Sequence, residues 1–284
     1  MNLCSTSEVK KILAEFNLRP NKKLGQNFLI DRNILHKIIE SAEILKDDCV
    51  LEIGSGLGVL TQELSNLADK LIAVETDTYL IPVLDYTLLE YSNINLVHQD
   101  ILKIDFNDIL SSNKKYIVVG NLPYYITTPI ISHLIENKHF FSRFIVMVQR
   151  EVANRMTAKP NSEDYGSLSL YLNYHCKVSN VMNVSKNCFY PVPDVDSSVV
   201  RIDILDEPSV KVKDEKLLFA VIKAAFGQRR KTLHKSLEKT DIIGIDKTII
   251  SNALESANID ADRRGETLSI EEFALLSDAF TNLL

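Results

Sequence analysis

A short apolar segment that ends in a glycine-rich turn constrains the fold of this chain more than any other feature. Residues 49–53 (CVLEI) have the length and apolarity of a buried strand, and Gly54 and Gly56 begin a G-x-G-x-G turn directly after it. A helical pattern covers residues 57–67, and the next apolar segment ends at Glu75. Strand, glycine turn, helix, strand and acidic residue together are typical of a nucleoside-binding unit in an α/β protein.

The glycine spacing separates two ligands that such a unit can hold. The dinucleotide fingerprint is G-x-G-x-x-G, and Val59 stands where its third glycine belongs, with Gly58 one position early. This departure disfavours NAD chemistry. S-adenosylmethionine has no pyrophosphate, so it does not need the third glycine of the dinucleotide fingerprint. Only its short amino-acid tail must pass over the glycine turn. We therefore favour S-adenosylmethionine as the cofactor. Asp100 follows a third predicted strand and can accept from an adenine amine, although by itself it is more typical of a helix cap.

A fourth predicted strand, residues 116–119, stops at Gly120 and delivers the sequence Asn-Leu-Pro-Tyr. In open α/β sheets, ligands bind beyond the carboxyl ends of the strands. The proline stiffens the turn, so the Asn121 amide and the Tyr124 ring are expected to stand in a fixed relation. An accepting amide oxygen beside an aromatic face suits a planar base that carries an amine. The alternative is an ordinary turn at the end of a strand.

The remaining segments divide the chain into two predicted domains. Alternating strand and helix patterns predict an α/β domain with a mostly parallel sheet over residues 1–207. From residue 208 onward the pattern is helical, which predicts a small all-helical domain over residues 208–284. Before this boundary lies a proline-stiffened loop. Its Phe189 is either a second stacking surface that faces the Tyr124 loop or an apolar plug under the loop, with about equal weight.

Charge and composition limit the other classes of function. The net charge is −6, but Arg229, Arg230 and Lys231 form a basic cluster at the expected start of a second C-terminal helix, which permits a nucleic-acid partner. No apolar run reaches the roughly 18 residues of a membrane span. The first residues carry charges where a signal peptide needs an apolar core. These two observations make a cytoplasmic protein the expectation. The four dispersed cysteines have no metal-ligand spacing, so we expect reduced thiols and no metal.

The motifs together resemble the ribosomal small-subunit RNA adenine dimethyltransferases, which are relatives of the macrolide-resistance RNA methylases. They run in family order over nearly the whole chain: GQNFL (25–29), EIGSGLGVLT (52–61), Glu75, QD (99–100), NLPY (121–124), FYPVPDVDS (189–197), FGQRRKTL (226–233) and RGETLS (264–269). The resemblance implies a Rossmann-like, S-adenosylmethionine-dependent methyltransferase domain with a helical C-terminal domain. The last two motifs favour the ribosome-biogenesis branch, because the resistance methylases keep that region less well.

The resemblance also assigns roles to single residues. It implies a cofactor site whose members are Asn27 and Leu29 at the amino-acid end or as a lid, Gly54 and Gly56 at the methionine tail, Glu75 at the ribose, Asp100 at the adenine amine, and Asn121 between cofactor and base. The implied reaction is dimethylation of two adjacent adenines in a hairpin loop near the 3′ end of small-subunit rRNA. The implied partner is an immature small subunit, and we expect a monomer.

A mechanism follows as a hypothesis. An adenine amine is a poor nucleophile because its lone pair is delocalised into the ring. If the Asn121 side-chain oxygen and the Leu122 carbonyl accept its hydrogens, the lone pair is freed, while Tyr124 and Phe189 hold the base by stacking. Arg229, Arg230 and Lys231 are the expected RNA contacts. Two rivals stay open: a non-catalytic assembly factor that keeps the fold, and a large-subunit resistance methylase.

Overall fold

The computed structural model describes residues 3–21, 24–239 and 246–284. The chain divides into two compact units, Met1–Ala153 with Ser179–Ile204 and Asn154–Val178 with Leu205–Leu284. The predicted boundary after residue 207 differs from this division, because a segment from the middle of the chain belongs to the second unit. Among the described residues, no helix has both the length and the apolarity that a membrane crossing requires.

The first unit is built on a seven-stranded sheet with the order β4-β3-β2-β5-β6-β9-β7. Strands β2 to β6 pair in parallel, and β9 runs antiparallel to β6. The strands of the sheet are β2 (Cys49–Ile53), β3 (Lys70–Glu75), β4 (Ile94–His98), β5 (Tyr116–Asn121), β6 (Phe141–Gln149), β7 (Cys176–Val184) and β9 (Ser197–Ile204). The predicted α/β class and the mostly parallel sheet are confirmed.

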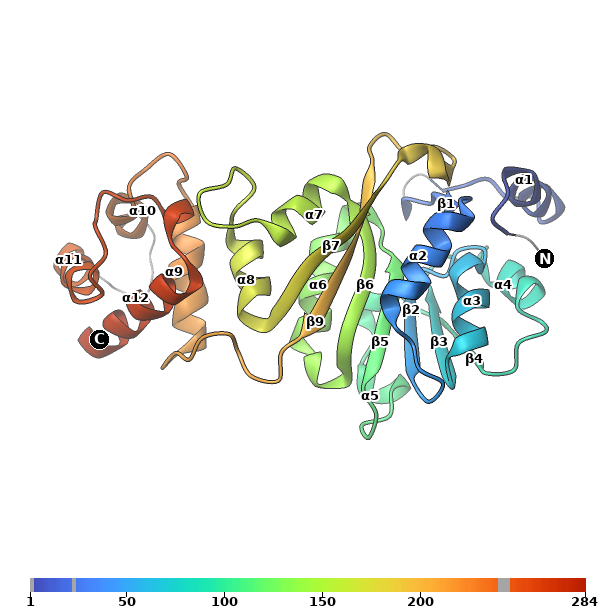
Figure 1. Ribbon diagram of the computed structural model, residues 1–284, viewed down its shortest axis with the longest axis horizontal. Coiled ribbons are helices and arrows are strands. Elements are labelled where there is room, and N and C mark those ends of the chain that lie inside the picture. The colour runs from blue at the N-terminus through green and yellow to red at the C-terminus, as the bar shows by residue number, and fades with distance from the viewer. Residues whose placement is uncertain (1–2, 22–23, 240–245) are drawn as a thin grey trace. The chain divides into compact units, whose positions relative to one another are not determined.

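Helices cover both faces of this sheet. Figure 1 shows α2 and α3 on one face and α6 on the other. The helices up to the end of β6 and just beyond it are α1 (Thr6–Glu15), which precedes all the strands, and then α2 (Arg32–Ala42), α3 (Val59–Leu67), α4 (Ile81–Thr87), α5 (Phe106–Ile109), α6 (Thr127–Glu136) and α7 (Arg150–Thr157). The central strands are buried on both faces, which explains why their sequences read as continuous apolar runs.

The strand order reverses between β2 and β5, which are neighbours although β3 and β4 lie between them in sequence. Such a switch point opens a crevice beyond the carboxyl ends of the strands. Ile53 pairs with both Val74 and Gly120, so the turns that follow β2, β3 and β5 begin at the same level of the sheet. The topology therefore brings the glycine turn, Glu75 and Asn121 to one edge.

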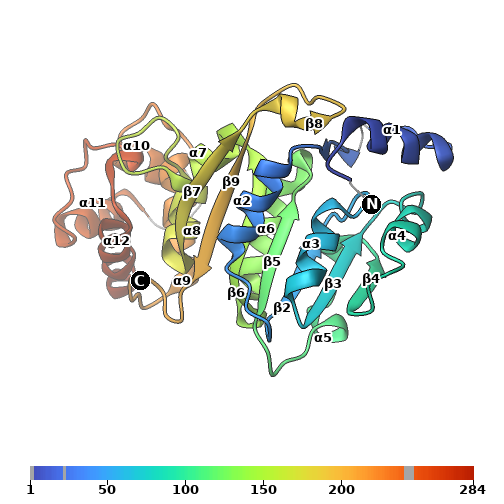
Figure 2. The ribbon, with the colours of Figure 1, turned by 45° about the vertical axis from the view of Figure 1, so that its right-hand side comes forward.

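A small second sheet lies at that edge. Strand β1 (Phe28–Leu29) pairs antiparallel with β8 (Phe189–Tyr190), and the Ile30 N–H donates to the Cys188 carbonyl at 2.9 Å. Figure 2 shows β8 near α1, at the end of the unit toward which β2, β3 and β5 point. We call residues 24–30 the N-terminal strap. Its pairing with β8 joins segments about 160 residues apart.

Gly120 does not end its strand, as the sequence suggested, but continues β5 through to Asn121. It pairs with Ile53 on one side and with Val146 on the other. A Cβ atom at residue 120 would stand 2.6 Å from the Ile53 carbonyl oxygen. Glycine is therefore required by the close approach of two strand backbones just before the site.

Replacing Gly120 by alanine is expected to lower the free energy of unfolding by about 3 kcal/mol, the scale of overpacking in a rigid core. Denaturant unfolding measures the difference. The matched control is Gly166→Ala, since a Cβ there meets no atom of the described chain within 4 Å and its stability should hardly change. Equal stabilities of the two variants would contradict the proposed role of Gly120.

The second unit is helical, as predicted for the end of the chain. Its helices are α8 (Ser167–His175), α9 (Glu215–Phe226), α10 (Leu233–Glu238), α11 (Lys247–Ser256) and α12 (Ile270–Leu283). The side chains of Leu170 and Tyr174 are buried with those of α9 and α12 in one core. The Tyr165 hydroxyl donates to the Leu268 carbonyl at 2.9 Å. These contacts explain why residues 154–178 belong with the C-terminal helices.

The predicted second C-terminal helix starts later than expected. Arg229, Arg230 and Lys231 lie in a turn, and α10 begins only at Leu233. The Leu233 N–H donates to the Arg263 carbonyl at 2.6 Å and so is held by a distant backbone group. The expectation that this basic cluster opens a helix is therefore wrong.

Candidate functional site

A cavity of about 320 Å³ lies at the carboxyl ends of β2, β3 and β5. All seven residues predicted to bind the cofactor line it: Asn27, Leu29, Gly54, Gly56, Glu75, Asp100 and Asn121. They come from the strap and from four successive strand ends. Parallel strands thus bring together the polar groups that the sequence places one after another.

The glycine turn forms the floor of the cavity. Gly54 and Gly56 have φ angles of +77° and +60°, a region that side-chain-bearing residues rarely adopt. A Cβ at Gly54 would lie 3.5 Å from the Asn121 backbone oxygen, and one at Gly56 would lie 3.5 Å from the Phe28 ring. Glycine thus leaves the backbone open to a ligand. Behind the turn, burial raises the pKa of the Glu52 carboxyl to about 7, while the Ser55 hydroxyl donates to it at 3.2 Å.

Glu75 joins the glycine turn to the end of β3. Its Oε2 accepts from the Gly56 N–H at 2.9 Å, and its Oε1 accepts from the N–H groups of Thr76 and Asp77, both at 2.8 Å. The side chain is only 6% exposed, and burial raises the pKa of the carboxyl, against the three backbone donors that lower it. A carboxylate oxygen accepts about two hydrogen bonds, so Oε2 keeps a free lone pair for a hydroxyl group of a ligand.

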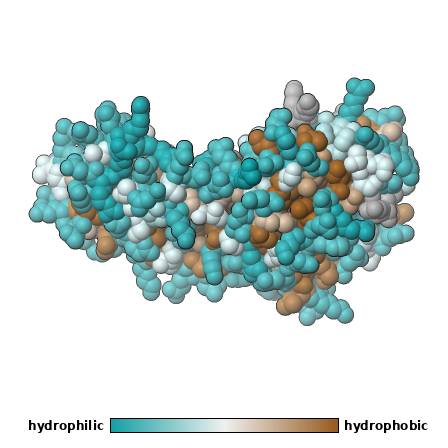
Figure 3. Space-filling view, turned by 45° about the horizontal axis from the view of Figure 1, so that its top comes forward, coloured by the Kyte–Doolittle hydropathy of each residue, from teal (hydrophilic) through white to brown (hydrophobic). Residues whose placement is uncertain are grey.

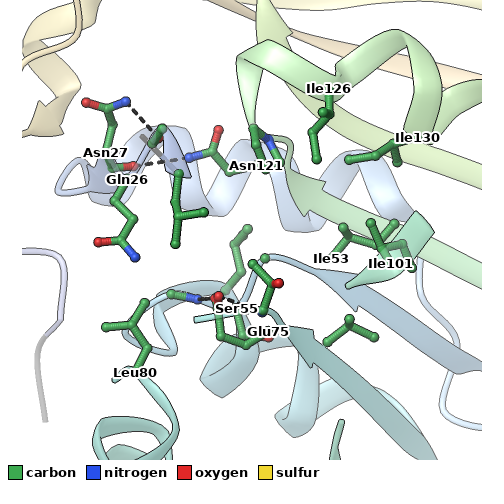
Figure 4. Close-up of a pocket in the computed structure, with 18 of the residues that line it drawn as sticks. Gln26, Asn27, Ile53, Ser55, Glu75, Leu80, Ile101, Asn121, Ile126 and Ile130 are labelled. Atoms are coloured by element: carbon green, nitrogen blue, oxygen red, sulfur yellow. Dashed lines mark hydrogen bonds between the residues drawn. The ribbon is translucent and has the colours of Figure 1, made fainter. Parts of the chain in front are cut away.

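One side of the cavity is apolar. Figure 4 shows Ile53, Ile101, Ile126 and Ile130 on the side opposite Asn27, with Ile126 beside Asn121. Asp100 lies at the lining of the same space, and its Oδ1 accepts from the Leu102 N–H at 3.1 Å. Asp100 therefore caps a helix, which was the alternative interpretation of this residue, and it also lines the cavity. An apolar side next to a carboxylate suits a purine ring that carries an amine.

The Asn121 amide is held from one end only. Its Nδ2 donates to the Asn27 backbone carbonyl at 3.2 Å, as the dashed line in Figure 4 marks. Its Oδ1 is buried and has no hydrogen-bond partner among the described residues. An unpaired buried carbonyl oxygen costs free energy of about 1–3 kcal/mol. Such a group in a cavity lining is a ready acceptor for an N–H donor of a ligand.

The strap carries a contact that sequence reasoning missed. The Gln26 Nε2 donates to Asp77 Oδ2 at 2.6 Å, and its Oε1 accepts from the Asn21 N–H at 2.7 Å. Gln26 thus ties the strap to the turn after β3, next to Glu75. Its place inside the GQNFL motif was the available signal, but nothing in the sequence indicated the partner. The Asn27 side chain itself turns inward to the Gly25 carbonyl, at 2.9 Å.

Tyr124 lies beside the cavity, not in its lining. It is half-buried, and its hydroxyl shares a hydrogen bond with the Ser197 hydroxyl at 2.6 Å. Burial raises the pKa of the Tyr124 phenol, while the Ser197 contact lowers it. The Leu122 side chain is buried, and the Leu122 N–H donates to the Met147 carbonyl at 3.0 Å. The turn is therefore rigid, as the proline suggested.

Phe189 is not a stacking surface in this structure. Its side chain is 1% exposed and belongs to the core of the first unit, where β8 pairs with the strap. Leu29 stands opposite Phe189 in that pairing. The alternative interpretation, an apolar plug under the loop, describes its observed place. A ring that stacks on a base must present a face, which a fully buried ring does not.

The basic cluster also differs from expectation. The Arg229 guanidinium donates to the Glu163 carbonyl at 2.6 Å and to the Tyr165 carbonyl at 3.2 Å. This side chain therefore holds the loop before α8 in place. Arg230 and Lys231 are exposed and keep the expected accessibility. Of the three predicted RNA contacts, Arg230 and Lys231 are the two whose side chains form no ion pair or hydrogen bond among the described residues.

Comparisons with known proteins identify the family of the chain. The family model described as ribosomal RNA adenine dimethylase matches residues 17–275. The "Ribosomal RNA small subunit methyltransferase A" of Clostridium botulinum (strain Loch Maree) is 49% identical over 275 residues, which are 97% of this chain and 99% of the relative. The protein of the same name from Clostridium acetobutylicum is 48% identical over 95% of this chain and 96% of its own length.

Solved structures show the same fold. A dimethyladenosine transferase from Plasmodium falciparum superposes with a TM-score of 0.75 at 29% identity, covering 87% of this chain and 95% of that one. The 23S rRNA methyltransferase ErmE superposes with a TM-score of 0.69 at 26% identity, covering 90% and 100%. The resemblance read from the motifs and the Rossmann-like methyltransferase fold are confirmed. The chain belongs to the ribosomal RNA adenine dimethylase family.

Proposed function

We propose that this protein transfers methyl groups from S-adenosylmethionine to the exocyclic amines of two adjacent adenines, in a hairpin loop near the 3′ end of small-subunit rRNA within an immature subunit. The observation that carries the proposal is the Asn121 Oδ1 atom, which is buried at a cavity built from a glycine turn and is without a hydrogen-bond partner in the described chain. Family membership supports the reaction class, and the names of the close relatives support the small subunit as acceptor.

The residues of the cavity fit the cofactor. Gly54 and Gly56 leave room for the methionine tail where a Cβ would stand. The free lone pair on Glu75 Oε2 suits a ribose hydroxyl, and the apolar side with Asp100 suits adenine. Asn27 and Leu29 in the strap close the space from the remaining side. When bound there, S-adenosylmethionine would supply a methyl group carried on a positively charged sulfur. The remainder of the cofactor would leave as a neutral thioether.

The chain's part in the reaction is to orient the target amine. The Asn121 Oδ1 atom accepts one N–H of the amine, which draws the nitrogen lone pair out of the purine ring. The Asn27 carbonyl holds the opposite end of the amide, so the oxygen keeps its direction. An amide cannot take up a proton near neutral pH, so the proton of the product passes to solvent. Orientation of this kind is a large part of the rate enhancement in a bimolecular transfer.

The target base needs an aromatic surface and a basic neighbourhood. Tyr124, at the same turn as Asn121, is the ring we assign to stacking, since Phe189 is buried. Figure 3 shows apolar residues gathered over part of the first unit, among mostly hydrophilic surface. In this unit Tyr125 and Val192 are more than half exposed. Exposed apolar surface suits the unstacked bases of an RNA loop. We propose that a monomer carries out the reaction, because every residue that lines the cavity belongs to one unit of a single chain. We also propose that the reaction takes place in the cytoplasm, as expected from the sequence.

Reversing the two accessible charges of the basic cluster is expected to weaken RNA binding. The variant Arg230→Glu with Lys231→Glu should lower affinity for immature small subunits and reduce the slope of log affinity against log salt by about 1 to 2, roughly 0.7–0.9 for each lost phosphate contact. Arg229 stays in place because it holds the loop before α8. Filter binding over a salt series measures both quantities.

The charge-matched control is Lys216→Glu with Lys223→Glu, two exposed lysines of α9. If this control weakens binding as much as the cluster variant does, the effect is one of net charge alone. An unchanged affinity in the cluster variant would remove Arg230 and Lys231 from the RNA contact.

The acceptor RNA separates the proposal from its rivals. The experiment offers S-adenosylmethionine with a radioactive methyl group to small and large ribosomal subunits, both prepared from cells that lack the modification. The proposal predicts label in small-subunit RNA. Label in large-subunit RNA would favour a resistance methylase. The absence of label from both, with the cofactor bound, would favour a non-catalytic assembly factor.

A further inference from the structure

The motif FYPVPDVDS ends in Ser197, a residue that has no role in the reaction described so far. Ser197 is the first residue of β9, is completely buried, and pairs with Gln149 at the end of β6. Its hydroxyl lies 2.6 Å from the Tyr124 hydroxyl. The contact joins the last residue of one motif to the last residue of NLPY, 73 positions earlier in the chain.

The backbone around Tyr124 is already fixed without this contact. The Thr127 hydroxyl donates to the Pro123 carbonyl at 3.0 Å, and the Leu122 N–H donates to the Met147 carbonyl at 3.0 Å. These hydrogen bonds do not restrict rotation of the Tyr124 ring about its side-chain torsions. A hydrogen bond at the far end of the ring, to a buried strand residue, removes that freedom.

The direction of this ring matters more because Phe189 is buried. Tyr124 and Phe189 are the two residues predicted to stack on the base. Because Phe189 is buried in the core, only the Tyr124 ring remains beside the site. Stacking on an aromatic ring contributes roughly 1–3 kcal/mol per base. A ring that turns away loses this contact and also shifts the base relative to Asn121, and small displacements of a reacting group slow a transfer strongly.

We infer that Ser197 is a positioning residue for methyl transfer, whose buried hydroxyl holds the Tyr124 ring in the orientation that the target adenine requires. The inference rests on the proposed function, because it assigns Tyr124 to the base. It also makes Ser197 separable from the cofactor site, since neither Ser197 nor Tyr124 lines the cavity. Removing the hydroxyl should therefore act on transfer and leave the cofactor bound.

The test compares Ser197→Ala, Tyr124→Phe and the double variant in the full chain. Steady-state transfer to unmodified small subunits gives kcat and KM, and titration with S-adenosylmethionine gives the Kd of the cofactor. We expect each single variant to lower kcat about tenfold, the scale of one hydrogen bond at a reacting group. The cofactor Kd should change less than twofold. The double variant should be no slower than either single one, because both remove the same bond.

Ser198→Ala is the matched control. Ser198 is the next residue, is equally buried, and donates to Asn183 Oδ1 at 2.9 Å instead of to Tyr124. Ser198→Ala should keep the kcat of the unsubstituted protein. If the loss of any buried hydroxyl from β9 slowed the reaction, kcat would fall in both Ser197→Ala and Ser198→Ala. Ser197→Thr, which restores the hydroxyl, should recover most of the kcat.

The outcomes separate the inference from the proposed function. An unsubstituted protein that methylates no RNA overturns the proposed function and the inference with it. Two results with an active protein would overturn the inference alone. One is an unchanged kcat in Ser197→Ala. The other is a double variant in which kcat falls by the product of the two single-variant factors. If Ser197→Ala does not fold, Tyr124→Phe removes the same bond from the other side, and an unchanged kcat there is equally decisive.

Discussion

An Asn121→Ala variant is expected to lose methyl transfer about a thousandfold while it keeps a folded cofactor site. The loss follows if the buried, unpaired Asn121 Oδ1 atom accepts from the reacting amine as proposed, since deletion of one preorganised group at a reacting centre costs about 10²–10³ in rate. The cofactor Kd should rise only severalfold, because Asn121 is one of many lining residues. Single-turnover transfer with saturating cofactor measures the chemical step.

Two further substitutions make this result specific. Asn121→Asp keeps an accepting oxygen but loses the donor to the Asn27 carbonyl, so we expect reduced, measurable transfer. Asn95→Ala removes an exposed asparagine of β4 and should leave the rate unchanged. A rate for Asn121→Ala within tenfold of the unsubstituted protein would contradict the role assigned to its side chain.

A Glu75→Ala variant is expected to bind S-adenosylmethionine about a hundredfold more weakly, equivalent to about 3 kcal/mol. The substitution removes the carboxylate that we propose as the acceptor for the ribose hydroxyl. It also leaves the N–H groups of Gly56, Thr76 and Asp77 without their acceptor, so the glycine turn loses its fixed shape. Isothermal titration with the cofactor measures the affinity.

The control for Glu75→Ala is Glu90→Ala, which removes an exposed carboxylate of the same unit and should bind the cofactor normally. The free energy of unfolding should also fall for Glu75→Ala, by about 1–3 kcal/mol for each buried donor left unpaired. An unchanged cofactor affinity in a folded Glu75→Ala protein would place the ribose elsewhere.

The cofactor cavity was accessible to sequence reasoning because of a property of parallel sheets. Strand ends that follow one another in sequence meet at one edge, so Gly54, Glu75, Asp100 and Asn121 were placed together by their order alone. Apolar runs of four or five residues marked the strands, and the glycine spacing distinguished S-adenosylmethionine from a dinucleotide as the expected cofactor. The roles of these residues in binding and transfer stay predictions.

Long-range pairings account for most of what sequence reasoning missed. The burial of Phe189 follows from β1–β8 pairing across about 160 residues, and two-residue strands leave no periodic signal. The need for glycine at position 120 comes from an approach between two strand backbones, which only the register of β2 and β5 reveals. Residues 154–178 join the C-terminal helices because of tertiary packing around Tyr165, whose local pattern favours neither unit.

The most direct test of the account is the chemical identity of the product. The protein is incubated with S-adenosylmethionine and small subunits that lack the modification, and the digested rRNA is analysed by mass spectrometry. We expect dimethyladenosine at two adjacent positions near the 3′ end of rRNA treated with the unsubstituted protein, and none in rRNA treated with Asn121→Ala. Methylation at another nucleotide, or dimethyladenosine that persists in Asn121→Ala, would contradict the account.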